Sequence, residues 1–223
     1  MLEVKKTRDG SVTLYNTELN VHYHSVHGAL QESSHVFIDN GVKFIAKEKN
    51  DKIRILEIGF GTGLNAILTY IIAKEQGFCI KYTGLEPYPL KKDIYLSVTE
   101  SYSEFLDSKY LSIWNQFSPG QTSVYDVESG IKIAVETCKW EDYCQLQKFD
   151  LIFLDAFAYD IQPELWSMDS LRKIHGYLDT NGICVTYAAK GIIKRNFKAS
   201  GFKVDTLAGP PGKREMIRAI RVN

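Results

Sequence analysis

The sequence of 223 residues predicts an α/β fold built on a mostly parallel sheet. Short apolar runs alternate with longer amphipathic stretches, which is typical of strands joined by helical crossovers. A glycine-rich turn at residues 59–63 joins the first of these strands to a helix. The last two apolar runs are separated only by Gly209-Pro210-Pro211-Gly212, so the final strands should pair antiparallel.

The remaining elements follow from the same patterns. We expect main-sheet strands at 53–58, 80–86, 131–137, 149–155, 183–188, 202–207 and 215–222, and helices at 64–76, 90–114 in two pieces, 140–146, 163–177 and 191–200. Residues 115–124 should be a loop, and the loosely alternating residues 11–38 should form one or two hairpins. We therefore divide the chain into an N-terminal β extension, residues 1–50, and a core domain, residues 51–223.

Composition favours an ordinary soluble globule, with 44% hydrophobic and 24% charged residues. Residues 1–10 are charged and lack a secretory pattern, and no apolar run is long enough to cross a bilayer. The four cysteines are scattered, which indicates reduced thiols and a cytoplasmic protein. Four histidines at 22, 24, 27 and 35 fit no regular metal-site spacing, so we expect no metal. Because no apolar run is long enough to cross a bilayer, we also expect no membrane partner.

Charge is unevenly distributed although the net charge is zero. From residue 190 to the end there are nine basic and two acidic residues, so this segment carries +7 and residues 1–189 carry −7. Such a segment is either a solvated basic face or a surface that binds phosphates. The candidate RNA-binding residues are Lys190, Lys194, Arg195, Lys198, Lys213 and Arg214.

The glycine-rich turn is the first candidate for a ligand site. Glycines at 59, 61 and 63 let a ligand approach the backbone, and the helix that follows presents its N-terminus. The dinucleotide-binding fingerprint would need a sixth-position glycine where Leu64 stands. The alternative is a tight strand-to-helix connection without a ligand. With Glu57 two residues before Gly59, the pattern E-x-G-x-G-x-G resembles motif I of the class I (Rossmann-like) S-adenosylmethionine-dependent methyltransferases.

Two further acids end predicted strands and should lie at the same rim of the sheet. Glu86 can accept both hydroxyl protons of a ribose, and Asp155 can accept a proton from an amine that is being methylated. The stretch 136–142 should supply an adenine slot. The alternatives are that Glu86 is a solvated loop acid and that Asp155 caps the following segment.

Several motifs, in one order, resemble a particular methyltransferase family. They are Tyr23-His24-Ser25 with Gly28, Glu32 and Val36-Phe37; residues 57–65; Leu85-Glu86-Pro87-Tyr88-Pro89-Leu90; residues 153–158 with Pro163-Glu164-Leu165-Trp166; and Gly212-Lys213-Arg214-Glu215-Met216. Across residues 23–219 the chain is similar to the methyltransferase domain of MnmC. That family completes 5-methylaminomethyl-uridine at the tRNA wobble position.

The resemblance implies N-methylation of 5-aminomethyl-uridine, with S-adenosylmethionine as cofactor and the anticodon arm of tRNA as partner. It implies that Asp155 is catalytic and that the cofactor contacts Glu57, Gly59, Phe60, Gly61, Thr62, Gly63, Asn65, Glu86, Thr137, Cys138 and Asp155. The chain departs from the family at Tyr159-Asp160-Ile161-Gln162 and at Thr137-Cys138. Because the flavin-dependent half is absent, we expect a monofunctional monomer that needs a separate source of the aminomethyl precursor.

Two other functions fit part of the pattern. An aminopropyltransferase or another small-amine methyltransferase shares the fold and both acids, but it needs no basic face. A non-catalytic scaffold that holds tRNA would need no base at Asp155. The basic C-terminal segment and the retained aspartate therefore favour an RNA methyltransferase.

Overall fold

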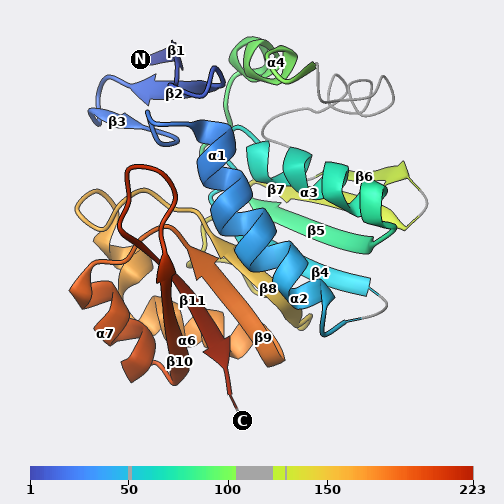
Figure 1. Ribbon diagram of the computed structural model, residues 1–223, viewed down its shortest axis with the longest axis vertical. Coiled ribbons are helices and arrows are strands. Elements are labelled where there is room, and N and C mark those ends of the chain that lie inside the picture. Colours follow the sequence, from blue (N-terminus) through green and yellow to red (C-terminus); the bar gives the residue numbers. More distant parts are fainter. Residues whose placement is uncertain (50–51, 104–122, 129, 223) are drawn as a thin grey trace.

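The computed structural model describes the chain except residues 50–51, 104–122, 129 and 223 (Figure 1). Its strands are β1 Leu2–Lys6, β2 Val12–Asn16, β3 Val21–His22, β4 Lys52–Ile58, β5 Cys79–Leu85, β6 Ser123–Glu128, β7 Ile131–Glu136, β8 Phe149–Leu154, β9 Leu178–Thr186, β10 Phe202–Ala208 and β11 Glu215–Arg221. Its helices are α1 Ala29–Ser33, η1 Ser34–Val42, α2 Lys43–Ala46, α3 Leu64–Gln76, α4 Lys92–Glu100, η3 Pro163–Trp166, α6 Met168–Tyr177 and α7 Gly191–Ala199.

The main sheet has eight strands in the order β10-β11-β9-β8-β4-β5-β7-β6. The five central strands, β9-β8-β4-β5-β7, are parallel to one another, and β11 pairs antiparallel with both β9 and β10. This confirms the predicted mostly parallel sheet with an antiparallel last strand. The opposite edge is also antiparallel, because β6 pairs with β7. Residues 115–122 of the expected loop lie outside the described residues, but residues 123–124 belong to β6.

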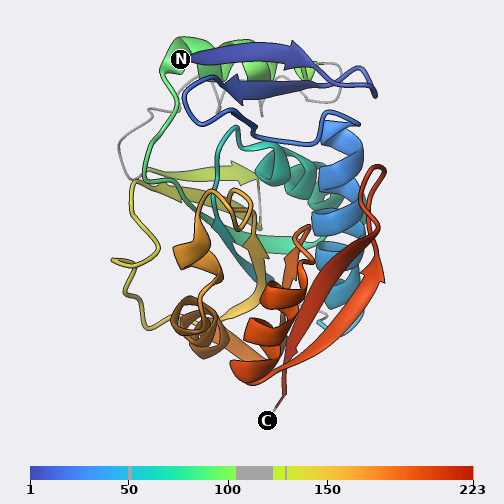
Figure 2. The same cartoon turned by 90° about the vertical axis from the view of Figure 1, so that its left-hand side faces the viewer.

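Helices cover both faces of the sheet (Figures 1 and 2). Alternate residues of each central strand point to opposite faces. On one face, Ile55 and Phe153 pack in a core that includes residues of η1 and α3. On the other face, Leu56 and Ile152 pack with buried side chains of α6 and α7. Burial on both faces explains why the central strands are almost continuously apolar in the sequence.

The N-terminal segment forms a small antiparallel sheet followed by a helix. The expected hairpin is confirmed by the pairing of β2 with β3, and β1 adds an unexpected edge strand. The expectation of strands up to residue 38 was wrong, because α1, η1 and α2 follow one another directly. Val36, Val42 and Ile45 recur at roughly helical spacing and are buried against the main sheet. The division of the chain at residue 50 stays a prediction.

Two predicted helices also differ from the structure. Residues 140–142 form a turn and residues 143–146 are irregular, and the rings of Trp140 and Tyr143 pack on Tyr177. The expected helix 163–177 is interrupted at Ser167, which ends η3 and caps α6 by accepting a hydrogen bond from Ser170 N. A serine in this position restarts a helix, which continuous apolar spacing does not reveal.

Candidate active site

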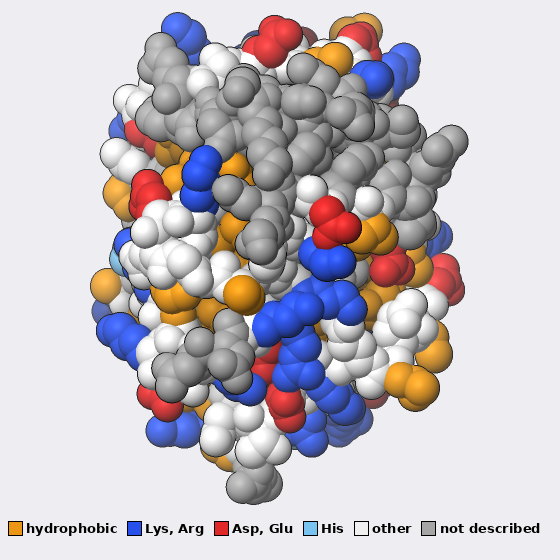
Figure 3. All heavy atoms as spheres, turned by 90° about the vertical axis from the view of Figure 1, so that its right-hand side faces the viewer, with side chains coloured by type: hydrophobic (Ala, Val, Ile, Leu, Met, Phe, Trp, Pro, Cys, Tyr) orange, Lys and Arg blue, Asp and Glu red, His pale blue; other side chains and the backbone are white. Residues whose placement is uncertain are grey.

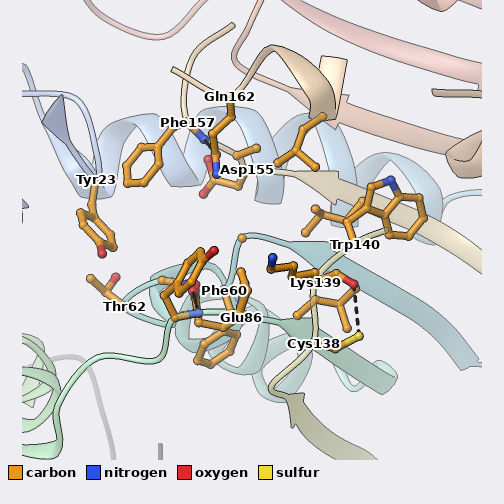
Figure 4. Close-up of a pocket in the computed structure, with 18 of the residues that line it drawn as sticks. Tyr23, Phe60, Thr62, Glu86, Cys138, Lys139, Trp140, Asp155, Phe157 and Gln162 are labelled. Atoms are coloured by element: carbon orange, nitrogen blue, oxygen red, sulfur yellow. Dashed lines mark hydrogen bonds between the residues drawn. The ribbon is translucent and has the colours of Figure 1, made fainter. Parts of the chain in front are cut away.

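A cavity of about 610 Å³ opens at the carboxyl ends of β4, β5 and β8 (Figure 4). The loops that follow β4 and β5, the segments that follow β7 and β8, and part of the N-terminal segment line it. A volume of this size suits a cofactor or a drug-sized ligand. Of the predicted cofactor residues, those that line the cavity are Gly59, Phe60, Gly61, Thr62, Asn65, Glu86, Cys138 and Asp155. Glu57, Gly63 and Thr137 do not line it.

The glycine-rich loop lies in close contact with the segment after β8. Gly59 has a φ of +94°, and a Cβ added there would lie 2.4 Å from the carbonyl oxygen of Asp155. Gly61 has a φ of +51° and faces the ring of Tyr23, which a Cβ would approach to 3.3 Å. Gly59 therefore needs glycine for both backbone conformation and space, while at Gly61 the positive φ favours glycine and the ring of Tyr23 leaves little room for a larger side chain.

Glu86 is held at the cavity wall by two backbone amides. Its carboxylate accepts hydrogen bonds from Gly61 N at 2.8 Å and from Tyr88 N at 2.9 Å. Burial raises the pKa of this carboxyl, while the two hydrogen bonds act in the opposite direction. Each carboxylate oxygen has a further lone pair for a ligand hydroxyl.

Asp155 and Glu57 are linked by the amide group of Asn65. Asn65 Nδ2 donates to Glu57 Oε1 at 2.7 Å and to Asp155 Oδ2 at 2.8 Å. Glu57 is fully buried beneath the loop and also accepts a hydrogen bond from the hydroxyl of Tyr82 at 2.6 Å. Its burial, with the charge of Asp155 as a second cause, raises its pKa well above the usual range. Burial, and next the charge of Glu32, raises the pKa of Asp155 to about 7.

This proton affinity suits Asp155 to accept a proton near neutral pH. Figure 4 shows its side chain on one wall of the cavity, beside Phe157 and Gln162, with Glu86 and Phe60 on the facing wall. The two acids that the sequence places at strand ends are thus on opposite sides of one cavity.

The end of the cavity beyond β7 is formed by residues 138–142, within the predicted adenine segment. The thiol of Cys138 donates a hydrogen bond to the carbonyl oxygen of Lys139 at 3.1 Å. Trp140 is fixed by Ser170, which accepts a hydrogen bond from its indole nitrogen at 2.9 Å. The slot therefore combines an aromatic side chain with polar groups.

The N-terminal segment supplies a wall that sequence reasoning missed. Tyr23 packs edge-on against Phe157, with ring centroids 5.3 Å apart, and burial raises the pKa of Tyr23 to about 12. His24 lies between Thr13 and Thr62, and burial lowers the pKa of its ring to about 4. Other lining residues from this segment are Asn16, Glu18 and Leu19, which no motif marks. The family resemblance had drawn attention to Tyr23 and His24, whereas the sequence pattern alone had raised His24 only as a possible metal ligand.

The six predicted RNA-binding residues fall into two groups. Lys190, Lys194 and Lys213 form ion pairs with Asp160, Glu215 and Glu32. Arg195, Lys198 and Arg214 are exposed and form no ion pair with another described residue. Lysine and arginine side chains also gather on the face shown in Figure 3, and Lys49 and Arg54, near the start of β4, carry further positive charge and pair with Asp150. Positive surface charge is therefore not confined to the C-terminal segment.

The described residues offer neither a metal site nor a membrane span. None of their histidine, cysteine and acidic side chains cluster in threes that could hold a metal ion. No helix among them is both long and apolar enough to span a bilayer.

Known proteins resemble this chain in sequence and structure. A family model described as S-adenosyl-L-methionine-dependent methyltransferase matches residues 100–222. The tRNA 5-methylaminomethyl-2-thiouridine biosynthesis bifunctional protein MnmC of Leptospira interrogans is 30% identical over 207 residues, which cover 87% of this chain and 32% of that protein. MnmC of Campylobacter hominis is 25% identical over 92% of this chain and 31% of its own length. The chain thus spans about a third of these relatives.

Solved structures show the same relationship. MNMC2 from Aquifex aeolicus superposes with a TM-score of 0.77 and 25% sequence identity, covering 99% of this chain and 70% of that one. DesVI of Streptomyces venezuelae, at 13% identity and a TM-score of 0.51, shares the fold alone. These findings confirm the predicted fold and the similarity to the methyltransferase domain of MnmC.

Proposed function

Because the chain belongs to the family of S-adenosyl-L-methionine-dependent methyltransferases, we propose that it methylates the 5-aminomethyl nitrogen of a wobble uridine in tRNA. The names of the MnmC relatives support the choice of substrate. The single observation in the structure that supports the chemistry is the carboxyl of Asp155, which faces the cavity and has a pKa of about 7.

The cavity fits S-adenosylmethionine. Glu86, held by two backbone amides, has free lone pairs for the two ribose hydroxyls. Asn65 lines the cavity, and its buried Oδ1 has no hydrogen-bond donor among the described residues, so it can accept a bond from a ligand amino group. Residues 138–142 would hold the adenine. The bound cofactor supplies an electrophilic methyl group.

The part of Asp155 in this reaction is to prepare the amine. An alkylamine has a pKa near about 10 and arrives mostly protonated, so it must lose a proton before it can attack. Ionised Asp155 can accept a hydrogen bond from the ammonium, orient it and take the proton. Asn65 fixes one carboxylate oxygen, which leaves the other for the substrate.

The exposed cations Arg195, Lys198 and Arg214 are the ones best placed to contact tRNA phosphates, since the three lysines are already paired. Phosphate contacts hold an RNA arm while an unstacked base enters a pocket. The anticodon arm is therefore the proposed RNA partner.

A pair of synthetic anticodon stem-loops tests the proposed function. One carries 5-aminomethyl-uridine at the wobble position and the matched control carries uridine. With labelled S-adenosylmethionine, label should enter only the first RNA, and nucleoside analysis should find 5-methylaminomethyl-uridine. Equal labelling of both RNAs, or labelling of putrescine in place of RNA, would contradict the proposal.

A further inference from the structure

Three segments that are distant in sequence meet around the ammonium of Lys213, close to Ala156, the residue that follows Asp155. They contribute Glu32 from α1, Tyr187 from the end of β9 and Lys213 from the turn between β10 and β11. Figure 2 shows this turn reaching the start of α1. Gly212, which precedes the lysine, has a φ of +86°, and a Cβ there would lie 2.2 Å from the ring of His27. The turn is therefore closely packed against the N-terminal segment.

Lys213 is held on two sides. Its ammonium forms an ion pair with Glu32 Oε1 and lies 3.5 Å from the centroid of the Tyr187 ring. The Glu32 side chain is only 7% exposed, compared with 31% for Lys213. An ion pair this buried is costly to break, because removing one partner leaves an unpaired charge in the protein.

Glu32 and Tyr187, the two groups that hold Lys213, are both hydrogen-bonded to the backbone around the cavity. The hydroxyl of Tyr187 donates a hydrogen bond of 2.7 Å to the carbonyl oxygen of Ala156, the residue after Asp155. Glu32 Oε2 accepts a hydrogen bond of 2.8 Å from Ser25 N, in the segment that carries Tyr23 and His24. Glu32 and Tyr187 thus join Lys213 to two of the segments that form the cavity.

We propose that Glu32 and Lys213 are positioning residues that act together on Asp155, neutralising each other so that the aspartate stays a usable proton acceptor. Their value for catalysis rests on the proposed function, but their effect on the charge state of Asp155 does not. In this proposal Lys213, which does not line the cavity, acts on Asp155 rather than on RNA.

The charged groups around Asp155 act in opposite directions. Burial raises the pKa of Asp155 most, the Glu32 charge raises it further, and the Asn65 hydrogen bond and the Lys213 charge lower it. Glu57 faces Asp155 through Asn65, and the charge of Asp155 raises the pKa of Glu57. Tyr187, and His24 beyond the ion pair, are also electrostatically coupled to this cluster.

Opposite substitutions should therefore move Asp155 in opposite directions. Lys213→Met leaves the Glu32 carboxylate unpaired, so the titration midpoint of Asp155 should rise. Glu32→Gln leaves the ammonium unpaired, so the midpoint should fall. The double variant removes both charges and should return towards the wild-type midpoint, and Lys213→Arg should retain it. A merely structural pair would not give two shifts of opposite sign.

The measurement is carbon-detected NMR of protein labelled in its aspartate carboxyl groups, titrated between about pH 4 and pH 9. The Asp155 signal is the one missing from Asp155→Asn, and Lys203→Met, on the exposed side of β10, is the matched control. Thermal unfolding verifies that each variant is folded. If a single variant does not fold, the double variant and Lys213→Arg still report on the pair. A changed titration midpoint of Asp155 in Lys213→Arg would overturn the proposal.

Equal midpoints in wild type, Lys213→Met and Glu32→Gln would also overturn it. A parallel pH profile of methylation of the aminomethyl stem-loop should show its acid limb displaced in the same two directions. If no RNA is methylated but the NMR midpoints shift as expected, the proposed function fails and the charge coupling stands.

Discussion

Replacing Asp155 by asparagine should stabilise the protein more at high pH than at low pH. The folded protein raises the pKa of this carboxyl from 3.8 to about 7. A raised acid pKa favours the protonated form in the folded state, so the stability that Asp155 contributes is lost as pH rises from its unfolded value through its folded value. The amide that replaces the carboxyl cannot ionise, so the variant avoids this loss.

The size of the effect follows from the two pKa values. Relative to the unfolded chain, the raised pKa of Asp155 destabilises the folded protein by about 2 kcal/mol at about pH 5 and about 4 kcal/mol at about pH 8. The side chain lines an open cavity, so solvent screens part of this cost. We expect the stability of Asp155→Asn relative to wild type to increase by about 1–2 kcal/mol between these pH values.

Urea denaturation at both pH values, in the absence of ligand, measures this difference. Asp93→Asn on α4 makes the same chemical change at an exposed site and serves as the control. If Asp155→Asn changes stability equally at both pH values, Asp155 does not carry a raised pKa and the argument for it as a base near neutral pH is refuted.

Three other predictions concern ligands and turnover. Gly61→Val should weaken S-adenosylmethionine binding sharply in calorimetry, because the φ of Gly61 is +51° and Tyr23 leaves little room. Gly176→Ala, with open space around it, is the control. Unchanged affinity in Gly61→Val would contradict the role of the loop in cofactor binding. Asp155→Asn should bind the cofactor but lose about a hundredfold or more in turnover, partly regained at high pH as more amine is neutral; near-normal turnover would exclude a base. The double variant Arg195→Glu, Lys198→Glu should weaken tRNA binding and flatten its salt dependence in filter assays. The double variant Lys91→Glu, Lys92→Glu is the control and should change neither. If the first double variant keeps the wild-type dependence of affinity on salt, tRNA binds at another surface.

The sequence predicts well whatever depends on local backbone chemistry. The glycine loop, the strand before it and the helix after it follow from Gly59, Gly63 and an adjoining apolar run, and β4 and α3 confirm them. Glu86 and Asp155 could be placed at one rim because parallel strands end together. Both line the same cavity.

Contacts between distant segments could not be predicted in this way. Lys213 belongs to a basic run, and nothing in that run shows that its ammonium is paired with Glu32, 181 positions earlier. The cavity wall at residues 16–19 likewise depends on how the small N-terminal sheet packs on the core. The helix at residues 29–46 was missed because β-branched and aromatic residues there suggested strands, whereas burial against the sheet decided its conformation.

The contacts between chain-distant segments also set the order in which the centre can form. Glu32 meets Lys213, and His35 meets the carbonyl oxygen of Ala208, across sequence separations of 181 and 173 residues. During synthesis the N-terminal segments emerge first, and these contacts must wait until the β10–β11 turn has left the ribosome. The surroundings of Asp155 can therefore be completed only after β10 and β11 have been synthesised, well after the glycine loop has emerged.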